Sequence, residues 1–227
     1  MARLTKTSSN EEILAVLNET AEAVSVVLRA NKDWSLSGLR DTQYSVDLRA
    51  DSAALEVLHG AGVAVLSEES EITGTFGDDD LCVVMDPLDG STNASRGVQW
   101  FATALCAIDK NGMRAGLVVN QANGIDRYWA TTGGGAFHNG VAMRPSACVD
   151  LSEAVVGVSG IPKGRCRAAV GRGLGHPLQP RHRLPRNVAA PRSDSRISGG
   201  LARSRLLCRK LLNHWCLLPG PGDVVGG

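Results

Sequence analysis

The chain has 227 residues, of which 43% are hydrophobic and 21% are charged. This is the composition of an ordinary globular protein with a substantial core, in one large domain or two small ones. No apolar run approaches the length of a membrane span, and residues 1–10 lack the apolar core of a secretory signal. We therefore expect a cytoplasmic protein. The six cysteines show neither a C-x-x-C pair nor a cysteine–histidine spacing typical of zinc sites.

The charge is divided unevenly along the chain. Residues 1–162 contain 11 basic and 21 acidic side chains, a net charge of −10. Residues 163–227 contain 13 basic and 2 acidic side chains, a net charge of +11. An asymmetry of this size indicates that the two parts have different functions or different origins.

The first predicted element is an amphipathic helix. Ser9 and Glu12 have the spacing of a capping box, and apolar residues then recur on one helical face over residues 13–28. Residues 31–42 are polar and rich in turn formers, so they are expected to form a loop.

A second helix and a strand follow. Residues 52–59 predict a short helix that ends at Gly60, with His59 on its surface. Residues 63–66 predict a short buried strand. The strand leads into Ser-Glu-Glu-Ser at 67–70, which on its own is best interpreted as a solvated turn.

The stretch around which the chain is organised covers residues 83–93 and reads Val-Val-Met-Asp-Pro-Leu-Asp-Gly-Ser-Thr-Asn. Apolar residues 81–85 predict a buried strand. We expect this strand to end at Asp86, because Pro87 cannot donate to the ladder of an interior strand. The small residues that follow predict a tight turn and a helix start.

Two carboxylates, Asp86 and Asp89, therefore lie just beyond a strand end. Ligand sites of open α/β sheets lie at such strand ends, and carboxylate oxygens are suitable ligands for Mg2+. The backbone amides of Gly90 and Ser91, at a helix start, would suit a phosphate. A plain surface turn is the alternative, because Asp, Pro, Gly, Ser and Asn are also the commonest turn formers.

More strands are predicted downstream. Residues 101–108 and 113–119 are apolar runs joined by Asp-Lys-Asn-Gly at 109–112, which indicates a hairpin. Residues 128–131 predict a third strand, and residues 154–158 predict another.

A glycine-rich segment at 133–140 follows the third of these strands. It lacks the Lys-Ser/Thr of a phosphate-binding loop, so we interpret it as a pair of structural turns. His138 is expected on the loop surface.

The motif at 86–93 resembles the D-P-[ILV]-D-G-[ST]-x-N signature of the inositol monophosphatase family, which are Mg2+-dependent, lithium-sensitive phosphatases. Residues 67–70 are similar to the family's G-E-E-[ST] motif, with serine in place of glycine. Asp51 occupies the position of the acid in its T-x-A-D context, where Leu48 replaces threonine. Residues 133–140 resemble its G-x-G-A-x-x-N-G segment.

The resemblance covers about residues 9–162. It implies an α/β fold, the layered α-β-α-β-α sandwich of the inositol monophosphatase and fructose-bisphosphatase type. Residues 1–150 would form the N-terminal α+β metal-binding phosphatase domain. Residues 151–227 would be an incomplete remnant of the C-terminal α/β domain, with aberrant sequence from about residue 163.

The family's activity implies Mg2+-dependent hydrolysis of a small phosphate monoester, with inositol monophosphate favoured. Matching positions imply that the metal ligands are Glu68, Asp86, Asp89 and the Leu88 carbonyl. They imply catalytic roles in orienting and deprotonating a water for Glu68, Asp51 and Ser91, and phosphate binding by Gly90 and Ser91.

Other functions stay open at this point. A 3′(2′),5′-bisphosphate nucleotidase has the same metal motif, and a catalytically inactive metal- or phosphate-binding remnant is a third candidate. The expected partner is a small phosphate ester and not a membrane or a nucleic acid, and a homodimer is left open.

The basic C-terminal part departs from the family. The family has a W-D-x-A-[AG]-G motif there, whose aspartate completes the metal site, but Trp215 is followed by Cys216. A nucleic-acid-binding extension would need more aromatic residues, and a disordered tail would contain fewer leucines and cysteines. We favour a third interpretation, an out-of-frame translation of the second domain.

Overall fold

The computed structural model describes residues 3–74, 81–145 and 147–150. The chain divides into two compact units, Met1–Arg144 and Pro145–Gly227, and every described helix and strand lies in the first. The strand expected over 154–158 and the basic region 163–227 lie outside the described residues, and the domain boundary expected at residue 150 stays a prediction.

The first helix, α1 (Asn10–Ala30), confirms the predicted amphipathic helix and its cap. The Ser9 side chain accepts from the Glu12 amide at 3.2 Å, and the Glu12 carboxylate accepts from the Ser9 amide at 2.7 Å. One face of α1 is fully buried, while Val26 on the other face is 57% exposed. No helix in the described part of the chain is long and apolar enough to cross a membrane.

The second helix, α2 (Ser45–Gly60), is longer than predicted. The predicted start at residue 52 was wrong, because the first two turns carry polar side chains on the inward face. Asp47 caps the start by accepting from the Tyr44 amide at 2.7 Å. Asp47 and Asp51 are both buried on the same face as Leu58, so burial follows the helical period while hydrophobicity does not.

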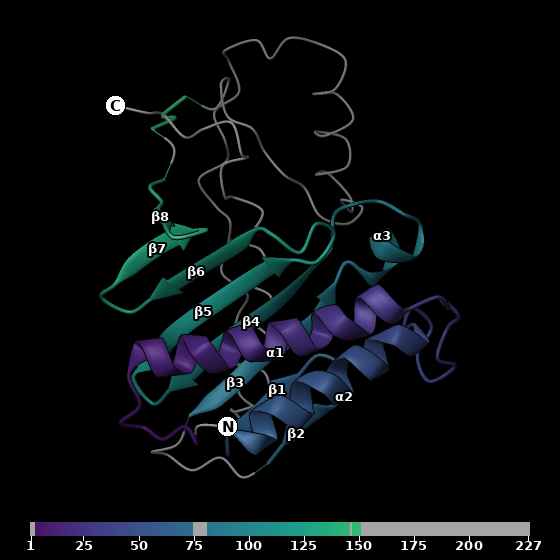
Figure 1. The fold of residues 1–227 in the computed structure, drawn as a ribbon, viewed down its shortest axis with the longest axis horizontal. Helices are drawn as coiled ribbons and strands as arrows, with labels where there is room; N and C mark the ends of the chain where they lie inside the picture. Colours follow the sequence, from purple (N-terminus) through teal and green to yellow (C-terminus); the bar gives the residue numbers. More distant parts are fainter. Residues whose placement is uncertain (1–2, 75–80, 146, 151–227) are drawn as a thin grey trace, which may run out of the picture. The chain divides into compact units, whose positions relative to one another are not determined.

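The strands form one eight-stranded sheet in the order β2-β1-β3-β4-β5-β6-β7-β8 (Figure 1). Among these strands only β1 and β3 pair in parallel, and all other neighbours are antiparallel. Their bounds are β1 (Ala64–Ser67), β2 (Glu71–Thr73), β3 (Cys82–Asp89), β4 (Ala102–Asp109), β5 (Gly112–Asn120), β6 (Arg127–Thr131), β7 (Gly135–His138) and β8 (Val141–Ala142).

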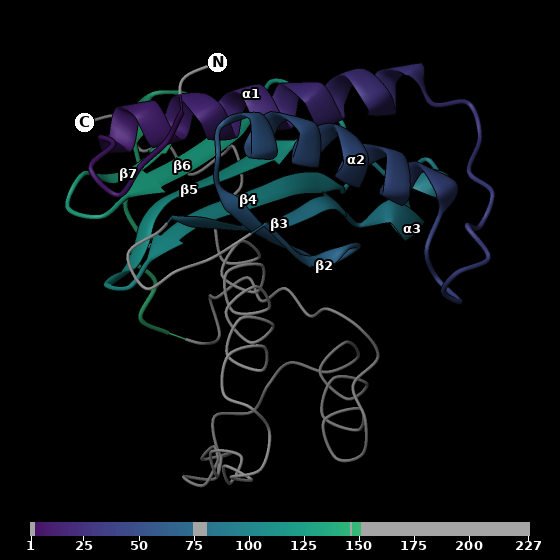
Figure 2. The ribbon, with the colours of Figure 1, turned by 90° about the horizontal axis from the view of Figure 1, so that it is seen from below.

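Helices α1 and α2 lie side by side and cover one face of the sheet (Figure 2). The core forms between these two helices and the sheet, and one cluster contains side chains from α1, α2, β1, β3, β4 and β5. Three side chains of this cluster are fully buried (0% exposed): Leu17 of α1, Leu58 of α2 and Met85 of β3. The core therefore holds the two helices against the strands that carry the acidic motifs.

The prediction that this strand ends at Asp86 was wrong, because β3 continues to Asp89. Asp86 pairs with Ala104 and Asp89 pairs with Ala102, so the register shifts between them. Three steps along β3 are thus matched by two along β4, which is a β-bulge. The missing amide of Pro87 is tolerated because proline is accepted at bulges.

The predicted hairpin is confirmed, because β4 and β5 pair closely up to Asp109 and Gly112. The glycine-rich segment at 133–140 forms β7 between two turns. The expectation that His138 lies on a loop surface was wrong. It lies in β7, stacks on Tyr128 with ring centroids 4.3 Å apart, and contacts the Asp126 carboxylate at 3.0 Å.

Candidate active site

The parallel pair β1–β3 brings two acidic segments to one end of the sheet. Ser67 lies opposite Met85, and the Glu68 amide donates to the Met85 carbonyl at 3.1 Å. Asp86 follows Met85 directly, and the side chains of Glu68 and Asp86 come within hydrogen-bonding reach. Strand direction therefore places these two carboxyl groups next to each other.

The bulge of β3 carries the remaining part of the acidic turn. Asp86 is buried, and its Oδ1 accepts a hydrogen bond from the Leu88 amide at 3.1 Å. Asp89 is half-buried at the end of the strand. Asp86 and Asp89 thus flank Leu88 across the bulge.

Gly90 connects this turn to the short helix α3 (Ser91–Ser95). Its φ of +89° is in the left-handed region, and a Cβ at this position would lie 2.8 Å from the Trp100 carbonyl oxygen. Only glycine fits both conditions without a backbone shift. The glycine of the motif is therefore required by the close approach of the chain after α3.

Helix α2 adds two more buried carboxyl groups. The Ser67 hydroxyl donates to Asp51 Oδ1 at 2.5 Å, which ties α2 to the end of β1. Asp47 accepts from the Tyr44 amide through Oδ2, while its Oδ1 is buried without a hydrogen-bond partner among the described residues. An unpaired buried oxygen of this kind is costly unless a ligand or water reaches it.

Four acids of this part of the structure, Asp47, Glu69, Asp86 and Asp89, have raised pKa values. Burial is the main cause that raises the pKa of Asp86, and Glu68 and Asp89 raise it further. Burial, and then Glu68, raise the pKa of Asp89. Burial also raises the pKa of Glu69, and it raises the pKa of Asp47 to about 6 although the Tyr44 amide opposes it. Burial is the common first cause for these four groups, and repulsion from neighbouring carboxylates adds to it.

Arg40 brings positive charge and order to the turn after β1. Its guanidinium donates to the carbonyls of Glu68 at 2.9 Å and Glu69 at 2.8 Å, and lies 3.7 Å from the Glu69 carboxylate. The Gln43 side-chain amide donates to the same carboxylate. The loop before α2 is thereby fastened to the acidic turn.

These residues fit a hard cation by charge and by donor type, because carboxylates with raised pKa values gain most from a bound dication. The geometry is less complete. Within the described residues, no three histidine, cysteine, aspartate or glutamate side chains lie in a metal-holding arrangement as they stand. Binding of Mg2+ here would require the side chains of Glu68, Asp86 and Asp89 to turn toward one point.

The structure brings the sequence-predicted Glu68, Asp86, Leu88 and Asp89 together at one end of the parallel pair. It gives Asp51 and Ser91 different partners: Asp51 contacts Ser67, whereas the Ser91 side chain lies near Asp47 and partly opposes the rise in the pKa of Asp47.

The sequence analysis missed Asp47 and Arg40 and assigned Glu69 no role. Asp47 could have been found from its spacing, since it lies one helical turn before Asp51 on the same face. No sequence signal identifies Arg40, because its contacts are made across 28 and 29 residues.

In a metal-free solution, we expect Asp47→Asn to stabilise the protein at pH 7. The pKa of Asp47 is raised from 3.8 to about 6, so ionisation destabilises the fold as the pH rises through this interval. The gain should be absent near pH 4, grow until about pH 6 and then stay constant, with an upper limit of about 3 kcal/mol. Thermal unfolding at a series of pH values measures it. Equal stability of the two proteins at every pH would contradict the assignment of a strained carboxylate.

Comparison with known proteins identifies relatives of the described fold and motifs. The model of the "Inositol monophosphatase family" matches residues 7–169. A fructose-1,6-bisphosphatase/inositol-1-monophosphatase of Archaeoglobus fulgidus is 37% identical over 110 residues, which are 47% of this chain and 42% of that protein. An inositol-1-monophosphatase of Rhizobium meliloti is 36% identical over 138 residues, or 60% and 51% of the two chains.

A solved structure agrees with these relatives. The extragenic suppressor protein suhB of Bartonella henselae superposes with a TM-score of 0.52 at 29% sequence identity, over 60% of this chain and 55% of that one. The chain spans about half the length of the curated relatives that it matches. The matched region contains β1, β3 and the whole of the acidic turn, and on this basis the chain belongs to the inositol monophosphatase family.

Proposed function

We propose that this protein is a Mg2+-dependent phosphoric monoester hydrolase that acts on a small phosphate ester, with inositol monophosphate as the favoured substrate. The observation that carries the proposal is the placement of Glu68 beside Asp86 and Asp89 at the end of the parallel strand pair. The names of the relatives, which include inositol-1-monophosphatases, support the choice of substrate class.

In this proposal Mg2+ is held by Glu68, Asp86, Asp89 and the Leu88 carbonyl. When bound, the ion supplies activation of a water nucleophile and stabilisation of the charge that develops on the phosphate ester. Burial, and then the neighbouring Glu68, raise the pKa of Asp86, and a bound dication would favour the anionic form of this carboxyl group.

The other residues bind substrate and handle protons. Asp51 is buried and holds the Ser67 hydroxyl, so its second oxygen is the one that would accept a proton from the attacking water. Ser91 would orient that water, and the amides of Gly90 and Ser91 would bind phosphate oxygens. A side chain at Gly90 would meet the Trp100 carbonyl oxygen and shift the backbone that carries these two amides.

Two alternatives remain as outcomes of the experiments. A 3′(2′),5′-bisphosphate nucleotidase would release phosphate from a nucleotide bisphosphate and not from inositol monophosphate. An inactive remnant would bind metal or phosphate and release nothing.

The direct test is release of inorganic phosphate from inositol 1-phosphate, fructose 1,6-bisphosphate and a 3′,5′-nucleotide bisphosphate, each with and without Mg2+. We expect release that depends on Mg2+ and is inhibited by Li+ near the optimal Mg2+ concentration. Chelation by EDTA should abolish it. Release that is unaffected by EDTA would refute the proposed mechanism.

Asp89→Asn should weaken binding of Mg2+ or Mn2+, because it removes one anionic ligand and keeps the size of the side chain. We expect a loss of about tenfold or more in affinity, measured by calorimetric titration with Mn2+. Glu56→Gln, at an exposed position on α2, removes the same charge outside the acidic turn and is the matched control. If both variants bind like the unmodified protein, Asp89 is not a ligand.

The basic region should limit activity. Residues 163–227 contain only Asp194 and Asp223 as acids and no W-D pair. Two dications about 3.5–4 Å apart need enough carboxylates to offset their repulsion. We therefore expect turnover well below that of a version whose residues from Lys163 onward are restored to a reading frame that encodes W-D. Comparable turnover of the two proteins with Mg2+ would show that this region already supplies what the site needs.

A further inference from the structure

A hydrogen-bond relay connects helix α1 to the bulge of β3. Thr103 of β4 lies opposite the bulge, between the residues that pair with Asp86 and Asp89. Its hydroxyl donates to the Pro87 carbonyl at 2.8 Å. A side chain thus supplies a donor at the point where the regular ladder between β3 and β4 is interrupted.

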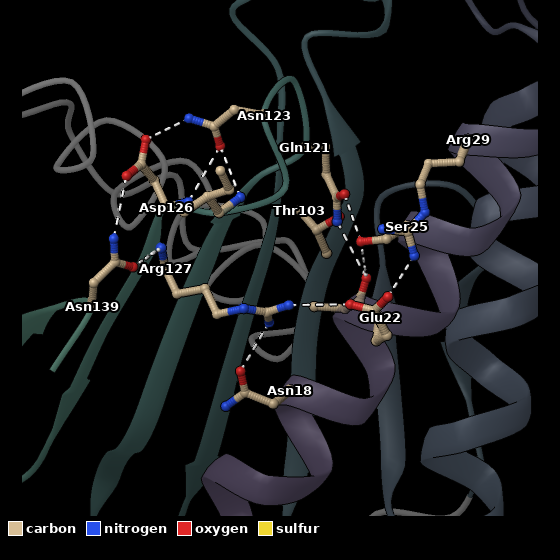
Figure 3. Close-up of polar contacts among 12 residues, drawn as sticks. Asn18, Glu22, Ser25, Arg29, Thr103, Gln121, Asn123, Asp126, Arg127 and Asn139 are labelled. Carbon is tan, nitrogen blue, oxygen red and sulfur yellow. Dashed lines mark hydrogen bonds and ion pairs between the residues drawn. The ribbon is translucent and has the colours of Figure 1, made fainter.

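The Thr103 hydroxyl is in turn contacted by the side chain of Gln121, just after β5 (Figure 3). The side-chain amide nitrogen of Gln121 lies 3.2 Å from the Ala21 carbonyl and 2.9 Å from Thr103 Oγ1. The Ser25 hydroxyl lies 2.7 Å from the amide oxygen of Gln121. A carbonyl can only accept, so the nitrogen of Gln121 must face Ala21 and must also donate to Thr103.

A threonine hydroxyl has one proton. Because Thr103 Oγ1 accepts from Gln121, its own proton is directed to the Pro87 carbonyl. Thr103 is 0% exposed and Ser25 is 3% exposed, so both hydroxyls are shielded from bulk solvent. The relay therefore specifies the orientation of one peptide plane in the turn.

That peptide plane joins Pro87 to Leu88. On its other side, the Leu88 amide donates to Asp86 Oδ1 at 3.1 Å. The plane is thus held at its carbonyl by Thr103 and at its amide by Asp86. Its orientation sets the start of the following peptide, which carries the Leu88 carbonyl and leads to Asp89.

We propose that Thr103, oriented by Gln121, is a positioning residue for the cation site of β3. It acts through the Pro87 carbonyl and aims the Leu88 carbonyl and the Asp89 carboxylate, without touching the ion. The inference rests on the proposed function, because it assigns to Thr103 the support of those two ligands. Partners of this kind typically change metal affinity about 10–100-fold when they are removed.

Three variants separate positioning from simple stability. Thr103→Val keeps the shape and removes the hydroxyl, and Thr103→Ser keeps the hydroxyl and removes a methyl group. Thr20→Val is the matched control, since Thr20 is also 0% exposed and its hydroxyl also donates to a carbonyl, that of Val16, at 2.8 Å. Thr20 lies within α1 and makes this bond inside the helix.

Two measurements on the full chain are compared, together with the melting temperature. The first is the affinity for Mn2+ by calorimetry. The second is hydrogen exchange of peptides that cover residues 85–94, recorded without metal. We expect Thr103→Val to weaken Mn2+ binding about tenfold or more and to speed exchange in this segment. Thr103→Ser should keep the Mn2+ affinity and the exchange rates of the unmodified protein. Thr20→Val should lower only the melting temperature.

The inference is overturned if Thr103→Val matches Thr20→Val in both measurements. If the unmodified protein binds no Mn2+, the proposed function fails, and the exchange of residues 85–94 alone then decides whether Thr103 orders the turn. If Thr103→Val does not fold, Gln121→Met takes its place, because it removes the donor to Thr103 and leaves the Pro87 contact to an undirected hydroxyl. Unchanged exchange over 85–94 in that variant would also overturn the inference.

Discussion

The parallel pairing of β1 with β3 is the constraint on which the candidate site depends. Every other pairing among the described strands is antiparallel and would place the ends of consecutive strands at opposite edges of the sheet. Because β1 and β3 run in the same direction and Ser67 lies opposite Met85, the residues that follow both lie at the same end of this strand pair. Glu68 and Asp86 are therefore neighbours although 17 residues of the chain, including the strand β2, lie between them. Without this pairing the two acidic motifs would not lie at the same end of the sheet.

The same pairing opposes stability in the absence of a ligand. Burial and repulsion raise the pKa values of Asp86, Asp89, Glu69 and Asp47. The ionised forms of these carboxyl groups therefore destabilise the fold when no cation is bound. Two features reduce the cost: Arg40 lies against Glu69, and Asp47 lies in the first turn of α2, where the helix dipole favours a negative charge. Functional sites commonly retain destabilising groups of this kind because the bound ligand offsets them.

The supporting structure reaches further than the acidic turn itself. Helix α1 carries no proposed ligand, yet its Ser25 and Ala21 orient Gln121, which in turn orients Thr103 beneath the bulge. On the same helix, Glu22 and Asn18 bind Arg127 of β6, so α1 is fixed to the sheet by directed contacts in addition to core packing (Figure 3). A rigid second layer of this type is what keeps ligand oxygens in place when their mutual repulsion would spread them apart.

Sequence alone determined several local elements and predicted the acidic residues of the candidate site. The capping box of Ser9, the hairpin at 109–112 and the run of Asp86, Asp89 and Gly90 depend on neighbours in the chain, and such patterns can be recognised from one sequence. Tertiary structure decided the rest. It carried β3 past Asp86 through a bulge, started α2 at Ser45, placed His138 in a strand, and brought Asp47, Arg40 and Thr103 to the acidic turn. These contacts join residues far apart in the chain, and their energy comes from burial and strand pairing, which local residue patterns do not encode.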